Sequence, residues 1–209
     1  MAVARAPNGY RKSVFVNAPF SADRRNVFEA IVFTVLACGF TPRCALELDN
    51  AGQVRLEKIV ALIRDCHLGI HDISYMELDG GLPRFNMPFE LGLFLGADRF
   101  GQKWVAQKAC TIFDREPFRY QRVLSDIAGQ DIRAHRCDPA TASSETRTWL
   151  SHHLGRTGQI PGSTAIWTMY GEFEAELPAL AALSLRNGDE LTFLERRHIA
   201  TEWLRRRLA

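Results

Sequence analysis

The sequence predicts an α/β protein, a Rossmann-like (flavodoxin-like) parallel sheet with helices on both faces, followed by a C-terminal helical extension. Short apolar runs of strand length alternate with longer runs of helical periodicity through residue 137. Parallel strands need crossover connections, and right-handed crossovers place helices on both faces of the sheet. After Asp138-Pro139 the alternation stops and only helix-like segments follow.

Five segments have the apolar and β-branched composition of strands. The first, Ser13 to Ala18, reads Ser-Val-Phe-Val-Asn-Ala and stops at Pro19, and the third ends in Asp72. The polar residues before the first strand predict a frayed leader over residues 1–12. The expected strands are residues 13–18, 40–46, 67–74, 108–114 and 131–135.

Four helices are expected between these strands. Ser21 or Asp23 can cap the first, whose apolar face includes Val27, Ile31 and Val35 and which ends at Gly39. Residues 53–66 are clearly amphipathic and form the second. Pro88 opens the third, since proline suits the first turn of a helix. Residues 117–127 are expected to form the fourth.

The chain therefore divides into an α/β domain over residues 13–137 and a helical extension over residues 138–209. Within the extension, helices are expected over residues 146–154, 165–185 and 191–208. The stretch from Trp167 to Phe173 is rich in aromatic residues, and it either packs onto the α/β domain or forms the interface of a homo-oligomer. We expect it to dock, because isolated helices of this length are marginal in water.

Composition excludes several classes of function. The 209 residues are 46% hydrophobic and 24% charged, as in ordinary soluble proteins, and the net charge of +2 suggests no dedicated polyanion partner. The basic run Arg205 to Arg207 could be a nucleic-acid patch, but acidic residues between Glu172 and Glu190 in the same helical segment argue against this. No apolar run is long enough for a membrane span and no signal peptide is visible, so a cytoplasmic protein is expected.

The five cysteines are widely spaced and include no CxxC pair, which favours small buried side chains over disulfides or a zinc site. We expect neither a bound metal nor a cofactor. The chain has no GxGxxG and no GxxxxGK[ST] sequence. This absence argues against a Rossmann-type dehydrogenase and against a P-loop NTPase.

Ligands of open parallel sheets bind outside the carboxyl ends of the strands. Three segments should converge there. The loop after the first strand offers Asn17, Phe20 and Ser21, just before a helix whose free N–H groups suit phosphate or sugar oxygens. The third strand offers Asp72, which either joins the site or caps its local turn. The segment Arg84 to Glu90 precedes and opens the third helix.

Glu90 is the strongest catalytic candidate. It follows Pro88 at the start of an apolar helix, so its carboxylate is held on a packed scaffold. The alternative is that Glu90 only complements the helix dipole. Arg84 either binds a phosphate or is a solvated loop charge, and Asn86 is a further candidate for substrate binding. Phe20 either stacks on a base or fills a gap over the sheet.

The strand Val14 to Phe20, the strand ending in Asp72 and above all Phe89-Glu90-Leu91-Gly92 resemble the nucleoside 2-deoxyribosyltransferase-like superfamily and the related TIR-like domains. The resemblance covers about residues 13–136. It implies that Glu90 attacks or stabilises the sugar carbon of an N-glycosidic bond, and that Asp72 lies near the sugar or base.

The function implied by this resemblance is hydrolysis or transfer at the N-glycosidic bond of NAD or of a nucleotide or nucleoside. A role in bacterial antiphage defence follows from the same likeness. The partner is then a nucleotide-type small molecule, with NAD as a substrate and not as a cofactor. The alternatives are a non-catalytic module that binds a nucleotide signal and an adaptor that keeps the fold without the chemistry.

Overall fold

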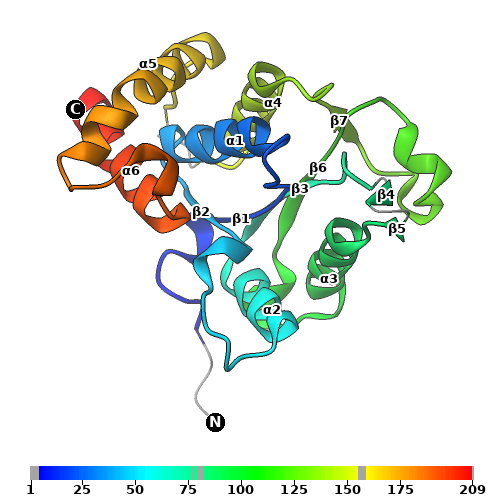
Figure 1. Ribbon diagram of the computed structural model, residues 1–209. Coiled ribbons are helices and arrows are strands. Elements are labelled where there is room, and N and C mark those ends of the chain that lie inside the picture. The colour runs from blue at the N-terminus through cyan, green and yellow to red at the C-terminus, as the bar shows by residue number, and fades with distance from the viewer. Residues whose placement is uncertain (1–4, 77, 80–81, 155–158, 209) are drawn as a thin grey trace.

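A computed structural model of the protein describes residues 5–76, 78–79, 82–154 and 159–208 (Figure 1). Its centre is a parallel sheet of five strands in the order β2-β1-β3-β6-β7. This order is that of flavodoxin-like folds and confirms the predicted fold class. The five strands are β1 (Ser13–Asn17), β2 (Thr41–Arg43), β3 (Leu68–Asp72), β6 (Ala109–Asp114) and β7 (Ile132–Ala134).

Helices cover both faces of this sheet (Figure 1). On one face lie α1 (Arg25–Ala37) and α4 (Pro139–Ser151), and on the other lie α2 (Arg55–Asp65) and α3 (Asn86–Phe100). Side chains of β1 alternate between the two: Val14 and Val16 pack towards α1, whereas Phe15 packs towards α2 and α3. Burial on both faces explains why the three central residues of β1 and the first three of β3 are not polar.

Two further helices form an outer layer on α1. These are α5 (Ser163–Ala182) and α6 (Phe193–Leu208), seen beyond α1 in Figure 1. The ring centroid of Phe33 in α1 lies 5.3 Å from that of Phe173 and 6.1 Å from that of Trp203. The end of the chain therefore docks on the α/β layer, as the aromatic stretch predicts. The aromatic contacts run through α1, α5 also packs against α4, and Arg197 of α6 donates to the Pro42 carbonyl of β2.

The prediction of an α-helix over residues 117–127 is wrong. Two short 3₁₀ helices, Arg119–Arg122 and Ser125–Ile127, occupy this segment. Phe118 precedes them with a φ of 61°, a left-handed conformation that interrupts an α-helix. Tyr120 is buried and its hydroxyl reaches the carbonyl oxygens of Ala128 and Gln130, so tertiary contacts fix the loop.

Helix α4 begins earlier than the predicted residue 146. Asp138 is its N-cap, since the carboxylate Oδ2 accepts a hydrogen bond from the Thr141 N–H at 2.9 Å. Pro139 takes the first helical position, where no N–H is required. The Asp-Pro pair that ends the strand-helix alternation is thus the start signal of α4, which lies beside α1 on the same face of the sheet.

Two segments near the N-terminus also differ from expectation. Within residues 5–12, Tyr10 starts the 3₁₀ helix Tyr10–Lys12, is 5% exposed and donates a hydrogen bond to the Trp104 carbonyl, so this part of the leader is anchored. The strand expected over 40–46 is reduced to β2, because a second 3₁₀ helix, Ala45–Glu47, begins after Cys44. Glu47 accepts from the Cys44 N–H and closes that turn.

The remaining strands, β4 (Leu78–Asp79) and β5 (Leu82–Pro83), form a small antiparallel pair between β3 and α3. Within the described segments, no helix has both the length and the apolar character that crossing a bilayer requires.

We predict that Phe173→Ala destabilises the whole protein by about 3–5 kcal/mol, because a large buried ring is removed between α5 and α1. Urea unfolding followed by circular dichroism measures this change. Leu183→Ala, at a residue that is 83% exposed, is the control and should cost little. If Phe173→Ala were as stable as this control, the outer layer would not be integral to the fold.

Candidate functional site

The candidate site lies where the order of the strands reverses. In the sheet, β2 lies on one side of β1, and β3 lies on the other side. The connections after β1 and β3 therefore diverge at the carboxyl ends of these two strands. Open α/β sheets bind ligands at this point. Helix α3 starts at Asn86 beside the end of β1 and carries Glu90 in its opening turns.

Asn17, the last residue of β1, holds the start of α3 in place. Its side-chain nitrogen Nδ2 donates to the Met87 carbonyl at 2.9 Å and to Nδ1 of His71 at 3.1 Å. Both partners accept, which fixes the orientation of the amide. The other amide atom, Oδ1, is buried and has no donor among the described residues. A buried acceptor without a donor is uncommon and is a mark of functional sites.

His71 is the second part of this contact. It lies on β3 opposite Asn17, is fully buried, and its ring packs 4.8 Å from that of Phe94 in α3. Burial lowers the pKa of His71 to about 3. The ring is therefore neutral, and because Nδ1 accepts from Asn17, the proton resides on Nε2. A neutral His71 positions Asn17 and is not a proton carrier near pH 7.

Glu90 is the most unusual carboxyl group at this edge. It is only 6% exposed, and no hydrogen bond or ion pair with a residue of the described segments meets its carboxyl group. Burial raises the pKa of Glu90 to about 7, opposed by a smaller effect of the Arg55 guanidinium at the start of α2. Buried carboxyl groups with raised pKa values are concentrated at catalytic sites.

Asp72 belongs to a different network. Its Oδ1 accepts from the Ser74 N–H at 2.9 Å and from Nε2 of His135 at 3.2 Å. His135 Nδ1 accepts a hydrogen bond from the Cys137 N–H, so Nε2 is the ring nitrogen that donates to Asp72. Because successive strand residues point to opposite faces, Asp72 is directed away from the face on which His71 meets α3.

Another buried carboxylate ends β6. Asp114 Oδ1 accepts from Nε and Nη2 of Arg119 at 2.8 and 2.5 Å, and Arg119 also donates to the Ile73 carbonyl. Burial raises the pKa of Asp114, while Arg119 opposes that effect. This ion pair ties the loop after β6 to the end of β3. It closes the carboxyl edge of the sheet on the side away from β2.

Two arginines meet one aromatic ring beside the site. The guanidinium carbons of Arg24 and Arg84 each lie 5.2 Å from the centroid of the Tyr75 ring. Arg24 also donates to the Cys137 sulfur at 2.9 Å. Asn86 is exposed at the first position of α3. Positive charge therefore gathers around the Tyr75 ring, and Arg84, one of its two cations, lies two residues before α3.

The structure thus separates the residues that the sequence proposed. Asn17 and the first turn of α3 are in direct contact, and Arg84 and Asn86 immediately precede or open that helix. Ser21 donates to Asp23 within its own loop. Phe20 lines a cavity between α1 and α6, apart from these residues. Asp72 joins His135 instead of Glu90.

Sequence reasoning missed His71, His135, Arg24 and Arg119 as members of this edge. A signal existed for His71, because a polar residue in an otherwise apolar strand must find a partner when it is buried. His135 sits where the predicted fifth strand ends, which is the same edge. Arg24 and Arg119 carried no signal, since surface arginines are frequent at loop ends.

No family model matches this chain, and the comparison with curated proteins found no relative. The resemblance to deoxyribosyltransferase-like and TIR-like domains therefore rests on the sequence motifs. Over the described residues, no group of three or more His, Cys, Asp or Glu side chains is arranged to hold a metal ion.

We predict that Glu90→Gln stabilises the protein above pH 7. The raised pKa means that folded Glu90 binds its proton more tightly than unfolded Glu90, so wild-type stability falls as the pH rises from about 4.5 to about 7. The full effect is on the order of 3 kcal/mol. Urea unfolding at pH 4, 6 and 8 should show the variant gaining over the wild type as the pH rises.

Glu57→Gln is the matched control, because Glu57 is exposed on α2. It should show no such dependence on pH. A Glu90→Gln variant that tracked this control at all three pH values would contradict a desolvated carboxyl at position 90.

Proposed function

We propose that the protein acts on the N-glycosidic bond of NAD or of a related nucleotide or nucleoside, with Glu90 as the group that acts on the sugar. One observation carries the proposal. A buried carboxyl with no hydrogen-bond partner among the described residues stands where a parallel sheet binds its ligands. The sequence resemblance around Glu90 supports the same chemistry.

Cleavage of an N-glycosidic bond develops positive charge on the sugar ring. A carboxylate stabilises this charge most strongly where water is excluded, because the local dielectric is low. Burial of Glu90 supplies that condition, and the same burial raises its pKa. A cationic substrate beside Glu90 would favour ionisation of the carboxyl, so the active form is expected once such a substrate is bound.

The reaction balances without a second acid when nicotinamide is the leaving group. A Glu90 carboxylate oxygen forms a bond to the sugar carbon while the carbon–nitrogen bond breaks and its electron pair leaves with the base. The cationic nicotinamide becomes neutral on departure and needs no proton. Water, or the hydroxyl of an acceptor, then releases the sugar from Glu90. Hydrolysis, transfer and cyclisation differ only in this second step.

Neighbouring groups suit the other parts of a nucleotide. The guanidinium groups of Arg24 and Arg84 lie over the Tyr75 ring and gather positive charge there. Guanidinium groups are suited to phosphate oxygens. Asn17 and neutral His71 hold the first turn of α3, so they position Glu90 without contacting the substrate in this scheme.

Substrates of this kind are cytoplasmic metabolites, and we place the protein in the cytoplasm on that ground. The resemblance to TIR-like proteins extends the proposal to bacterial antiphage defence through consumption of NAD.

We predict that Glu90→Gln abolishes most turnover while the fold remains intact. The amide keeps the shape of the side chain but lacks the charge and the nucleophilicity of a carboxylate. A loss of about 10²-fold or more is expected from removal of a group that stabilises the transition state. Purified protein is incubated with NAD and with a panel of nucleosides and nucleotides, and the products are resolved by chromatography.

Glu57→Gln again serves as the control and should retain wild-type turnover. Equal activity of the Glu90→Gln protein and this control would place the chemistry elsewhere. Saturable binding of a nucleotide by the wild type, with no product, would contradict the enzyme and favour a module that binds a nucleotide signal.

A further inference from the structure

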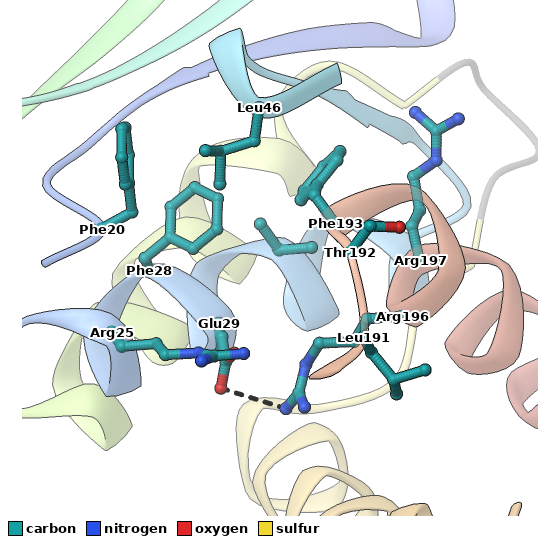
Figure 2. Close-up of a pocket in the computed structure, with 11 residues that line it drawn as sticks. Phe20, Arg25, Phe28, Glu29, Leu46, Leu191, Thr192, Phe193, Arg196 and Arg197 are labelled. Atoms are coloured by element: carbon teal, nitrogen blue, oxygen red, sulfur yellow. Dashed lines mark hydrogen bonds and ion pairs between the residues drawn. The ribbon is translucent and has the colours of Figure 1, made fainter. Parts of the chain in front are cut away.

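A cavity of about 350 Å³ lies between α1 and the start of α6. The loop after β1 and the 3₁₀ helix after β2 close it from the other side (Figure 2). Its volume falls in the range of small-molecule sites. The cavity shares none of its lining residues with the cluster of Asn17, His71 and Glu90, so it stands apart from the proposed activity.

Three aromatic rings form one wall of this cavity. Phe20 packs edge-to-face on Phe28 with centroids 6.3 Å apart, and Phe28 lies 6.0 Å from Phe193. Phe28 is buried, whereas Phe20 and Leu46 are 41% and 42% exposed. Figure 2 shows Phe20, from the loop after β1, and Leu46, from the 3₁₀ helix after β2, on the same side of the cavity. A flat aromatic ring that covered this apolar surface would bind favourably, through stacking or edge-to-face contacts with the three phenylalanines.

Cations outnumber anions in the lining. Arg25, Arg196 and Arg197 contribute to it, whereas Glu29 is its acidic residue. Arg25 bonds Glu29 through Nε at 2.7 Å, and Arg196 reaches the other oxygen of Glu29 at 3.0 Å, so one carboxylate serves two guanidinium groups. Figure 2 shows this carboxylate between the two arginines.

Arg25 has donors to spare. Its Nη groups find no acceptor among the described residues, and its side chain is 44% exposed. Arg197 is more committed, because its Nη1 donates to Glu47 and to the Pro42 carbonyl. An anionic group that entered the cavity would therefore meet the free edge of the Arg25 guanidinium, and guanidinium pairs well with planar anions.

We propose that this cavity binds a small, flat aromatic molecule that carries one anionic group. The ring would stack among Phe20, Phe28 and Phe193, and the anionic group would pair with Arg25. Such a ligand would bridge the outer helix α6 and the loop after β1. This loop starts at the residue that follows Asn17. The cavity would thus connect the helical extension to the segment that positions α3.

The test uses two fluorescent probes on the full chain. 8-Anilinonaphthalene-1-sulfonate has the ring and the anion, and N-phenyl-1-naphthylamine has the same rings without the anion. We expect one saturable site for the sulfonate. Phe20→Ala should weaken binding of both probes, whereas Arg25→Gln should weaken only the sulfonate, by about tenfold, because a charge-assisted hydrogen bond is lost.

Matched controls are Phe100→Ala and Arg205→Gln, which alter an exposed ring and an exposed arginine paired on its own helix, both outside the cavity. Both should bind like the wild type, as should Glu90→Gln, which separates this site from the proposed activity. The proposal is overturned if no saturable binding occurs, or if Phe20→Ala and Arg25→Gln bind like the controls. Equal loss of both probes in Arg25→Gln would also contradict an anion contact.

Discussion

The side-chain amide of Asn17 is the contact on which the geometry of the candidate site depends. Its two hydrogen bonds join the end of β1 to His71 on β3 and to the first turn of α3. These elements are distant in sequence, and the parallel pairing of β1 with β3 brings them to one edge. Met87 is three residues before Glu90 on the same helix. Because Asn17 fixes the Met87 carbonyl, it also fixes the position of Glu90 relative to the edge of the sheet. The neutral state of His71 is part of this contact, because a protonated Nδ1 could not accept from Asn17.

Burial of Glu90 has opposite consequences for stability and for chemistry. A desolvated carboxylate destabilises the folded protein near and above pH 7, and the nearby Arg55 guanidinium offsets only a smaller part of that cost. Apolar packing stabilises the fold elsewhere, and α5 and α6 add a second apolar layer on α1 through Phe33, Phe173 and Trp203. Proteins keep such costly groups mainly at functional sites. The same low dielectric would strengthen the interaction of Glu90 with a cationic sugar.

Local patterns were sufficient to predict most of the sheet and the position of α3. The apolar strand before Asn17 and the Pro88 start signal depend on few neighbours, so the sequence carries them directly. The helix prediction over residues 117–127 failed because Phe118 adopts a left-handed conformation and the Tyr120 hydroxyl bonds carbonyl groups outside the segment. The sequence predicted the edge of the sheet at which the site lies, but not which side chains contact one another there. Strand alternation directs Asp72 away from the face of His71, and the cavity beside Phe20 exists only because α6 returns to α1.

Direct observation of the Glu90 carboxyl tests most sharply whether this group is desolvated in the folded protein. Carbon-detected NMR of protein labelled at the glutamate side-chain carboxyl carbons, with Glu90→Gln used to assign the resonance, follows its titration between pH 4 and pH 9. We expect a midpoint at about 7, set by burial, with the exposed Glu57 in the same spectra as a reference. A Glu90 midpoint near the ordinary glutamate pKa of about 4.3 would contradict it, because the carboxyl would then be solvated or paired.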